Sequence, residues 1–304
     1  MSNTRRKLSY LEDRVKEENV KILLMTESHL NPNILDEEIQ IPKFSVFRTD
    51  RIKRKCGGVL ILLEDSLSVA SSNVKHFSNS VCELLIINIE QLNLHLILVY
   101  RPPDTTKEEF IPCSKEIESY LSTIPSNENI LLAGDFNLPF LTWQDVDGSV
   151  IYRMKKGASQ DEKAQSEIIL NLTDKYLLNQ IITEPTRLNN TLDLIFHNNP
   201  EIIINHTVEN VSKCISDHNL IKCEMKMCNS SPSSEIKKKP EKLANFNYWS
   251  SKARWSDMNE HLNNVSWTEH ISSDTSVDSD INTLYNALLT ASEKFIPVRK
   301  STNY

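Results

Sequence analysis

The residues best suited to chemistry follow short apolar runs, at places where strands of a sheet would end. Glu27 follows the run KILLMT, Tyr100 follows LHLILV, and Asp135 and Asn137 follow ILLAG. Asp193 stands inside a further run, TLDLIF. Carboxylate and amide oxygens are the ligands that hard divalent cations prefer. The combination therefore predicts metal-assisted hydrolysis of a phosphodiester.

A histidine-containing turn completes this candidate set. Ser216-Asp217-His218 precedes the apolar run Leu220–Met225. Because a charged aspartate inside a strand is unfavourable to bury alone, Asp193 requires a partner, and the Asp217-His218 turn is a candidate. A histidine oriented by Asp193 would move a proton or stabilise the charge that develops on a phosphate. The oxygen donors for Mg²⁺ are then Glu27, Asp135, Asn137 and Asp217.

Each motif also has a purely structural interpretation. Thr26-Glu27-Ser28 is compatible with a helix N-cap, and Gly134–Asn137 with an Asx turn. Tyr100–Pro103 is compatible with a polyproline segment, and Ser216–His218 with an ordinary turn before a strand. Taken singly, these interpretations are favoured for every motif except Gly134–Asn137. Only the combination of all the motifs favours a catalytic site.

The elements that position these residues are expected to be short strands with a few helices. The strand-like runs are rich in Ile, Val and Leu without strict alternation, which predicts strands buried on both faces. The runs are 21–25, 44–47, 59–63, 84–89, 94–99, 130–133, 192–196 and 220–225. Helical spacing occurs at Leu8-Leu11-Val15, within 108–121 and within 168–178, and Pro112 predicts a break in the second helix. We expect two sheets packed face to face with helices outside.

Composition excludes several classes of protein. The chain has 304 residues, 39% of them hydrophobic and 25% charged, which is ordinary for a globular protein and argues against global disorder. No window approaches the roughly 18–20 apolar residues of a membrane span, so no membrane partner is expected, and the polar start MSNTRRKLSYLEDRV is not a signal peptide. The six cysteines form no CxxC pair, which indicates free thiols in a reducing, intracellular compartment and no structural zinc.

Charge is uneven along the chain. The net charge is −7, an excess of carboxylates that fits a metal site as well as a solvated surface. The local exception is a basic cluster just before Gly57-Gly58. A solvated loop and a contact to DNA phosphates are about equally compatible with this cluster. Its five residues are Arg48, Arg51, Lys53, Arg54 and Lys55.

Glycine is scarce, with five in the whole chain, where a typical content is about 7%. Gly57, Gly58 and Gly134 lie beside strand-like runs. A chain this poor in glycine is expected to keep it where the backbone needs a positive φ or a close approach. These three positions are therefore expected to be structural landmarks.

Composition also predicts the domain organisation. Residues 1–228 hold the strand-like runs and form the expected catalytic domain. Residues 229–242, NSSPSSEIKKKPEK, are rich in Ser, Pro and Lys and predict a linker. Residues 243–304 carry three of the four tryptophans and further apolar residues at helical spacing, which predict a small helical appendage.

The ordered motifs resemble the endonuclease/exonuclease/phosphatase family, and more narrowly the apurinic-type endonuclease domain of non-LTR retrotransposons of the LINE or jockey kind. Trp143, after the GDFN motif, fits that subgroup. Residues 4–228 carry the resemblance, and the tail is similar to the segment that joins such an endonuclease to a reverse transcriptase. In chain order the motifs are Glu27-Ser28-His29-Leu30, Cys56-Gly57-Gly58-Val59, Tyr100-Arg101-Pro102-Pro103, Gly134-Asp135-Phe136-Asn137, Thr191-Leu192-Asp193 and Ser216-Asp217-His218.

The resemblance implies a four-layer α/β sandwich, in which two packed mixed β-sheets are flanked by helices. It also implies a nuclear enzyme that nicks DNA with Mg²⁺ (or Mn²⁺) and leaves a 3′-OH for primed reverse transcription. By position, it assigns the metal to Glu27 and Asp217, the scissile phosphate to Tyr100 and His218, the attacking water to Asp135 and Asn137, and the orientation of His218 to Asp193.

Two departures from the family pattern widen the functional expectations. The family begins with a strand that carries an active-site asparagine, whereas this sequence starts almost directly in a helix, with Asn3 the only nearby candidate; no reverse transcriptase follows Tyr304. Loss of a core strand would expose apolar surface and unpaired backbone groups on its neighbours. We expect an active endonuclease, with a catalytically inactive remnant that binds DNA nonspecifically as the alternative. A phosphatase or lipid phosphodiesterase of the same fold is disfavoured by the YRPP motif, Trp143 and the tail.

Overall fold

The computed structural model describes residues 3–51, 56–67, 69–79, 81–146, 149–226, 246, 252–265, 267 and 277–297. The chain divides into two compact units, residues 1–234 and residues 235–304. The predicted linker, 229–242, lies outside the described residues. Every candidate site residue falls within the first unit, so the fold of that unit positions the site.

A six-stranded sheet forms the centre of the first unit. In spatial order its strands are β10 (Asn179–Gln180), β11 (Asp193–His197), β7 (Asn129–Asp135), β6 (Leu94–Tyr100), β5 (Glu83–Ile89) and β4 (Val74–Ser78). β6 and β7 are parallel, and the other neighbouring pairs are antiparallel. β5 and β6 are almost entirely buried, as expected for apolar strands that are covered on both faces.

The remaining strands form smaller sheets. A three-stranded antiparallel sheet has the order β1 (Ile22–Thr26), β3 (Val59–Glu64), β2 (Phe44–Thr49). Two hairpins pair β8 (Leu141–Val146) with β9 (Ser149–Met154), and β12 (Ile203–Glu209) with β13 (Leu220–Met225). Short 3₁₀ helices occupy Asp36–Glu38, Ser71–Asn73, Glu90–Leu92 and Pro200–Ile202.

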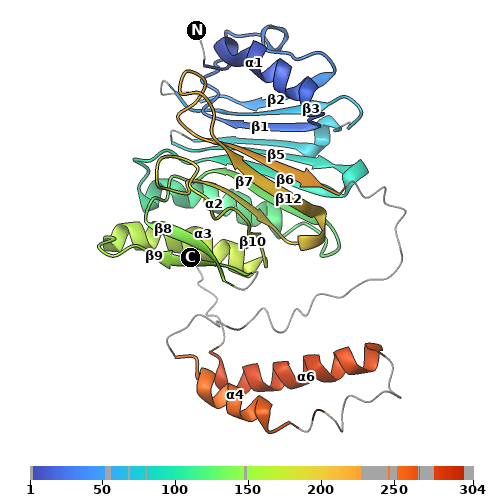
Figure 1. The fold of residues 1–304 in the computed structure, drawn as a ribbon, viewed down its shortest axis with the longest axis vertical. Helices are drawn as coiled ribbons and strands as arrows, with labels where there is room; N and C mark the ends of the chain where they lie inside the picture. Colours follow the sequence, from blue (N-terminus) through green and yellow to red (C-terminus); the bar gives the residue numbers. More distant parts are fainter. Residues whose placement is uncertain are drawn as a thin grey trace. The chain divides into compact units, whose positions relative to one another are not determined.

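Helices cover the outer faces of the two larger sheets (Figure 1). α1 (Asn3–Glu17) packs on the three-stranded sheet, and α2 (Lys107–Leu121) and α3 (Gln160–Lys175) pack on the far side of the six-stranded sheet. One apolar core lies under α1 and another under α2 and α3. A third apolar core, with residues from β3, β5 and β6, lies between the three-stranded and the six-stranded sheet. The first unit is therefore a four-layer α/β sandwich, as predicted. Its larger sheet is mixed, and its three-stranded sheet is antiparallel.

Each strand-like run of the sequence coincides with a strand, in β1, β2, β3, β5, β6, β7, β11 or β13. The predicted break at Pro112 is wrong, because α2 runs continuously through this proline. Pro112 is exposed, whereas the buried face of α2 is formed by other positions. The carbonyl group that Pro112 leaves without a donor thus lies on the solvent side, where water satisfies it.

β1 is an open edge among the described strands. It pairs with β3 alone, and all five of its residues, ILLMT, are only partly buried. β13 likewise pairs with β12 alone. Ion pairs tie α1 to this hairpin, with Arg14 Nη2 at 2.8 Å from Glu209 Oε2. The three-stranded sheet and the β12–β13 hairpin therefore both pack on the central sheet. They are not hydrogen-bonded to each other as one sheet, and the ion pairs of α1 connect them.

The second unit contains the described helices α4 (Trp255–Asn263) and α6 (Val277–Phe295). They pack through a small apolar core formed by Phe246, Met258, Ala291, Phe295 and Ile296. Trp255 is exposed and is not one of the buried residues of this core, and Trp249 lies outside the described residues. Across the described parts of the chain, no helix combines the length and the apolar character needed to cross a membrane.

Gly134→Ala is expected to destabilise the protein far more than Gly157→Ala. At Gly134 φ is 149°, and an added Cβ would lie 1.9 Å from the carbonyl oxygen of Val99 on the neighbouring strand β6. At Gly157 φ is 89°, but an added Cβ would meet nothing within 4 Å. In urea unfolding we expect a loss of about 1–2 kcal/mol for Gly157→Ala and of more than ~4 kcal/mol for Gly134→Ala. Equal losses would contradict the close approach of β6 and β7.

Candidate active site

Three candidate side chains form one row across the central sheet. Tyr100 on β6 is in register with Asp135 on β7, and Asp135 is in register with Asp193 on β11. Neighbouring strands lie about 4.8 Å apart, and residues in register share a face of the sheet. The topology of the sheet therefore brings together three positions that are far apart in the sequence.

Asp135 lies at the centre of this row and is 1% exposed. Its Oδ1 accepts a hydrogen bond of 3.1 Å from the backbone N–H of Asn137. Burial and then the nearby charge of Asp193 raise the pKa of Asp135 to about 8. A carboxylate with such a pKa is a much stronger base than an ordinary aspartate, which suits a group that takes a proton from water.

The Gly134–Asn137 motif is at once an Asx turn and part of the site. The turn is held by Arg101, which is fully buried. Arg101 donates through Nη1 to the carbonyl oxygens of Phe136 and Asn137, each at 3.1 Å. Asn137 Nδ2 donates to the carbonyl oxygen of Arg101 at 2.9 Å. The structural and functional interpretations of the motif are therefore compatible, because the turn is what places Asp135 and Asn137.

His218 lies in the turn before β13 and bridges two aspartates. Its Nδ1 is 2.7 Å from Asp193 Oδ2, the contact that the sequence predicted. Its Nε2 is 4.0 Å from Asp135 Oδ2. Burial acts to lower the pKa of His218, but the hydrogen bond and charge of Asp193 outweigh it, so the pKa is raised. His218 is thus suited to carry positive charge toward a phosphate.

Glu27 directly follows β1, and its side chain is 43% exposed. Tyr100 donates its hydroxyl hydrogen to Glu27 Oε1 at 2.5 Å. Burial, and then this bond to Glu27, raise the pKa of Tyr100, so the phenol stays protonated. The φ of Glu27 is 50°, in the left-handed region that residues with a side chain rarely adopt. Strained backbone of this kind is concentrated at functional sites.

Asp217 lies in the same turn as His218 but is engaged elsewhere. Its Oδ2 is 2.6 Å from Arg187 Nη2, and its side chain is 66% exposed. Burial acts to raise the pKa of Asp217, and the hydrogen bond with Arg187 outweighs it, so the pKa is lowered. The structure therefore brings Asp217 near the site with its carboxylate paired to an arginine that the sequence analysis did not identify.

Lys7 on α1 is a second cation that the sequence analysis missed. Burial lowers its pKa, and the charges of Asp217 and Glu27 act against that shift, so Lys7 is coupled electrostatically to both carboxylates. No motif marks Lys7, because it precedes the apolar residues of α1 and looks like a solvated lysine. Only the packing of α1 over the sheet reveals it.

The predicted basic cluster does not form one exposed surface in the described part of the chain. Arg48 is paired with Asp36 at 2.9 Å and donates to the carbonyl oxygen of Ile34. Arg51 is 9% exposed and paired with Glu83. Its guanidinium is held inside the protein, so a contact between Arg51 and a DNA phosphate does not fit this structure. Lys53, Arg54 and Lys55 lie outside the described residues.

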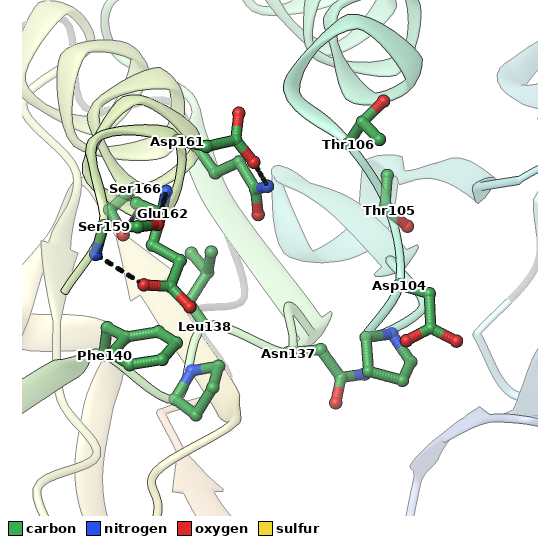
Figure 2. Close-up of a pocket in the computed structure, with 13 residues that line it drawn as sticks. Asp104, Thr105, Thr106, Asn137, Leu138, Phe140, Ser159, Asp161, Glu162 and Ser166 are labelled. Atoms are coloured by element: carbon green, nitrogen blue, oxygen red, sulfur yellow. Dashed lines mark hydrogen bonds between the residues drawn. The ribbon is translucent and has the colours of Figure 1, made fainter.

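A pocket of about 280 Å³ opens beside Asn137, between the first turns of α2 and α3 (Figure 2). Each helix start is already capped within the helix; Ser159, for example, donates its N–H to the Glu162 side chain at 2.7 Å. Asp104, Asp161 and Glu162 line the pocket, and Asp135 and His218 do not. Of the candidate site residues, Asn137 alone is among those that line this pocket, so the pocket is distinct from the row on the sheet.

The acidic row fits a divalent cation. Asp135, Asp193 and His218 each offer one ligand atom, and these atoms lie within 4.8 Å of one another. Glu27 is linked to the row by its hydrogen bond with Tyr100, and its charge also contributes to the raised pKa of Asp135. Oxygen-rich donor sets suit Mg²⁺ and Mn²⁺, and a bound cation would offset the negative charge that raises this pKa. The cluster that the structure assembles thus differs from the predicted pair of ligands, Glu27 and Asp217.

Residues 94–222 match the protein family described as endonuclease-reverse transcriptase. No curated protein matches the sequence. Among solved structures, the chain is similar to an AP endonuclease from Archaeoglobus fulgidus, with a TM-score of 0.53, 14% identity, and 73% of this chain and 95% of that chain covered. It is also similar to the 3′ phosphatase NExo from Neisseria bound to a product DNA hairpin, with a TM-score of 0.52, 12% identity and 72% and 94% covered. The AP endonuclease LMAP from Leishmania major has a TM-score of 0.51, 13% identity, and 74% and 84% covered.

At these identities the solved structures establish the fold, which is that of these nucleases. The family match covers the segment that carries Tyr100, Asp135, Asp193 and His218. The resemblance found in the motifs is therefore confirmed both by sequence and by fold. This chain has the fold of these nucleases, and its central segment, residues 94–222, matches the family described as endonuclease-reverse transcriptase.

Proposed function

We propose that this chain is a metal-dependent endonuclease that nicks DNA and leaves a 3′-OH. The observation that supports this most strongly is the row Tyr100–Asp135–Asp193, with His218 bonded to one end and Glu27 to the other. It combines a carboxylate base with a raised pKa, an imidazole whose pKa is also raised, and an accessible carboxylate beside a phenol. These are the groups that metal-assisted phosphodiester hydrolysis requires.

Glu27 is the metal ligand that we propose first, because its partly exposed carboxylate leaves room for water on a hard cation such as Mg²⁺ or Mn²⁺. Asp217 would join it by exchanging Arg187 for the cation. A bound cation would supply Lewis-acid polarisation of the phosphate oxygens. The buried carboxylates of Asp135 and Asp193 would complete the negative environment that holds it.

The protein's own side chains would then accept the proton of the attacking water and bind the phosphate. Asp135 orients an attacking water with Asn137 and accepts its proton. The water oxygen bonds to phosphorus, the bond between phosphorus and O3′ breaks, and the departing O3′ takes a proton from solvent, which leaves a 3′-OH and a 5′-phosphate. His218, held by Asp193, binds the phosphate oxygens as charge develops on them. The Tyr100 hydroxyl donates its single hydrogen to Glu27 in this structure, and it would turn this hydrogen to a phosphate oxygen when a cation occupies the Glu27 carboxylate.

DNA is the substrate that we propose, and a reverse transcriptase is the proposed partner in an intact element. The matched family is described as endonuclease-reverse transcriptase, and the NExo structure was solved with a product DNA hairpin. Lys7 and Arg187 add positive charge beside the acidic row. Nicking of chromosomal DNA to prime reverse transcription would place the protein in the nucleus.

Nicking of supercoiled plasmid DNA is expected with Mg²⁺ or Mn²⁺ and is expected to stop when EDTA removes the metal. The nicked product is expected to prime DNA synthesis by a polymerase without further treatment, because its end is a 3′-OH. A folded chain that leaves the plasmid supercoiled with either metal would support the alternative, a catalytically inactive remnant. Nicks that a polymerase extends only after phosphatase treatment would contradict the proposed product.

A further inference from the structure

We propose that Arg51 and Glu83 form a buried positioning pair that holds Tyr100 and the backbone around Glu27 in place for metal binding. This inference rests on the proposed function and adds two residues to it. Neither belongs to the predicted catalytic set, and Arg51 was predicted to contact DNA.

Arg51 and Glu83 form a bidentate ion pair. Arg51 Nε is 2.5 Å from Glu83 Oε1, and Arg51 Nη2 is 2.8 Å from Glu83 Oε2. Arg51 also donates to the carbonyl oxygen of Val81. Glu83 is completely buried and Arg51 nearly so. Two charges taken out of water are rarely a net gain in stability, so a pair with this geometry is better explained by the arrangement that it imposes.

Arg51 is in contact with the site through Tyr100. Its guanidinium carbon lies 5.2 Å from the centre of the Tyr100 ring, within the range of a cation–π interaction. The hydroxyl of the same ring donates to Glu27. Tyr100 is therefore fixed at its ring by Arg51 and at its hydroxyl by the proposed metal ligand.

Glu83 is in contact with the site through the backbone of Gly57 and Gly58. The N–H of Gly58 donates to Glu83 Oε2 at 3.1 Å. The carbonyl oxygens of Gly58 and Gly57 accept from the N–H groups of Ser28 at 3.2 Å and His29 at 2.8 Å, directly after Glu27. The carboxylate of Glu83 thus binds the segment before β3, and this segment accepts hydrogen bonds from the backbone directly after Glu27.

The two glycines show how closely these parts fit together. A Cβ at Gly57 would lie 2.5 Å from the guanidinium carbon of Arg51, and a Cβ at Gly58 would lie 2.6 Å from Ser28 Oγ. Both glycines have a positive φ, of 110° and 85°. Two of the five glycines of the chain therefore lie where the Arg51 side chain packs against the segment bonded to residues 28 and 29.

Such support is needed because the Glu27 backbone is strained. Glu27 and His29 both have a positive φ, of 50° and 54°. Conformations of this kind persist only where the surroundings over-determine them. A planar guanidinium fork matches a carboxylate and stacks on a ring, whereas a lysine ammonium keeps the charge without the fork. The pair is therefore expected to act through geometry as well as through charge.

The test compares Arg51→Met, Arg51→Lys and Glu83→Gln in the full chain, with Lys21→Met as the matched control. Lys21 also forms an ion pair in the small sheet, with Glu64 at 2.7 Å, but at the opposite end of β1 from Glu27. Mn²⁺ binding is measured by the electron paramagnetic resonance of free Mn²⁺, and kcat and KM by plasmid nicking. Near-ultraviolet circular dichroism reports whether each variant folds.

We expect Arg51→Met to weaken Mn²⁺ binding at least tenfold and to lower kcat more than it raises KM. Arg51→Lys is expected to recover only part of the loss, Glu83→Gln to resemble Arg51→Met, and Lys21→Met to match the wild type. Wild-type Mn²⁺ affinity and kcat in the folded variants would overturn the inference, as would a wild-type chain that binds no Mn²⁺. Unfolding of all three variants would assign the pair to stability and overturn it too. A wild-type chain that binds Mn²⁺ but cleaves no DNA would overturn the proposed function alone.

Discussion

Asp135→Asn is expected to lower DNA nicking by at least about 10³-fold and, in the same protein, to raise stability at alkaline pH. The loss of activity follows because asparagine cannot accept the proton of the attacking water. The gain in stability follows because the wild-type carboxylate is 1% exposed and lies beside Asp193. Asparagine keeps an oxygen that can accept the N–H of Asn137 but carries no charge.

The direction of the pH effect follows from the pKa. In the folded protein the pKa of Asp135 is raised to about 8, above its ordinary value of 3.8. The folded state therefore holds a proton that the unfolded state releases, and the wild type loses stability as pH rises from about 4 to about 8. At about 1.4 kcal/mol per pKa unit, the penalty above pH 8 is on the order of a few kcal/mol. The variant avoids this penalty, so its advantage is expected to be small at pH 5 and largest at pH 9.

Thermal unfolding of the wild type and Asp135→Asn at pH 5 and pH 9, without metal, measures this difference. Asp65→Asn is the matched control, since Asp65 is an exposed aspartate at the far end of β3 that accepts from Ser45. Added Mn²⁺ is expected to narrow the gap at pH 9 by stabilising the wild type more than the variant. Near-wild-type nicking by Asp135→Asn, or a lower melting temperature at pH 9, would remove Asp135 from the proposed role.

The sequence predicted the features that depend on a single stretch of chain, such as the strands. It also predicted a partner for a single charge, Asp193, that is unfavourable to desolvate alone. Apolar runs located the strands that carry the site, and each site residue stands at or near the end of such a run. The expectation that Asp193 needs a partner led to His218, because an unpaired charge in a strand is unfavourable in any fold. The scarcity of glycine pointed to Gly57, Gly58 and Gly134, and all three have a positive φ.

The sequence failed where the outcome depends on which segments meet. Arg51 stands in a basic run and resembles a surface residue, but Glu83, 32 positions later, takes it into the interior. Arg187 was not identified as the partner of Asp217, because nothing local in the sequence marks it. Lys7 approaches the site only because α1 packs above it. Charged residues are especially hard to place from sequence, since a buried pair and two solvated side chains have the same local pattern.

His218→Ala is expected to lower kcat for nicking by about 10²–10⁴-fold, because it removes the cationic group that faces the phosphate. Asp193→Asn is the more informative change. It leaves the imidazole in place but removes the charge that is 2.7 Å from Nδ1. The pKa of His218 is raised mainly by Asp193 against the effect of burial, so the variant is expected to lower it.

If His218 acts as a cation, activity falls as pH rises through its raised pKa. In Asp193→Asn this alkaline limb of kcat is expected to move to lower pH, since the loss of the close negative charge of Asp193 lowers the pKa of His218. Asp135 contributes in the opposite sense, because its base form is populated only as pH rises, so the two groups predict a bell-shaped profile. Asp135→Asn removes the acidic limb together with most of the activity, so the alkaline limb is followed in Asp193→Asn. Because the charge of Asp193 also raises the pKa of Asp135, the acidic limb is expected to move to lower pH in the same variant. An unchanged alkaline limb in Asp193→Asn would mean that His218 works as a neutral group, and that Asp193 only orients it.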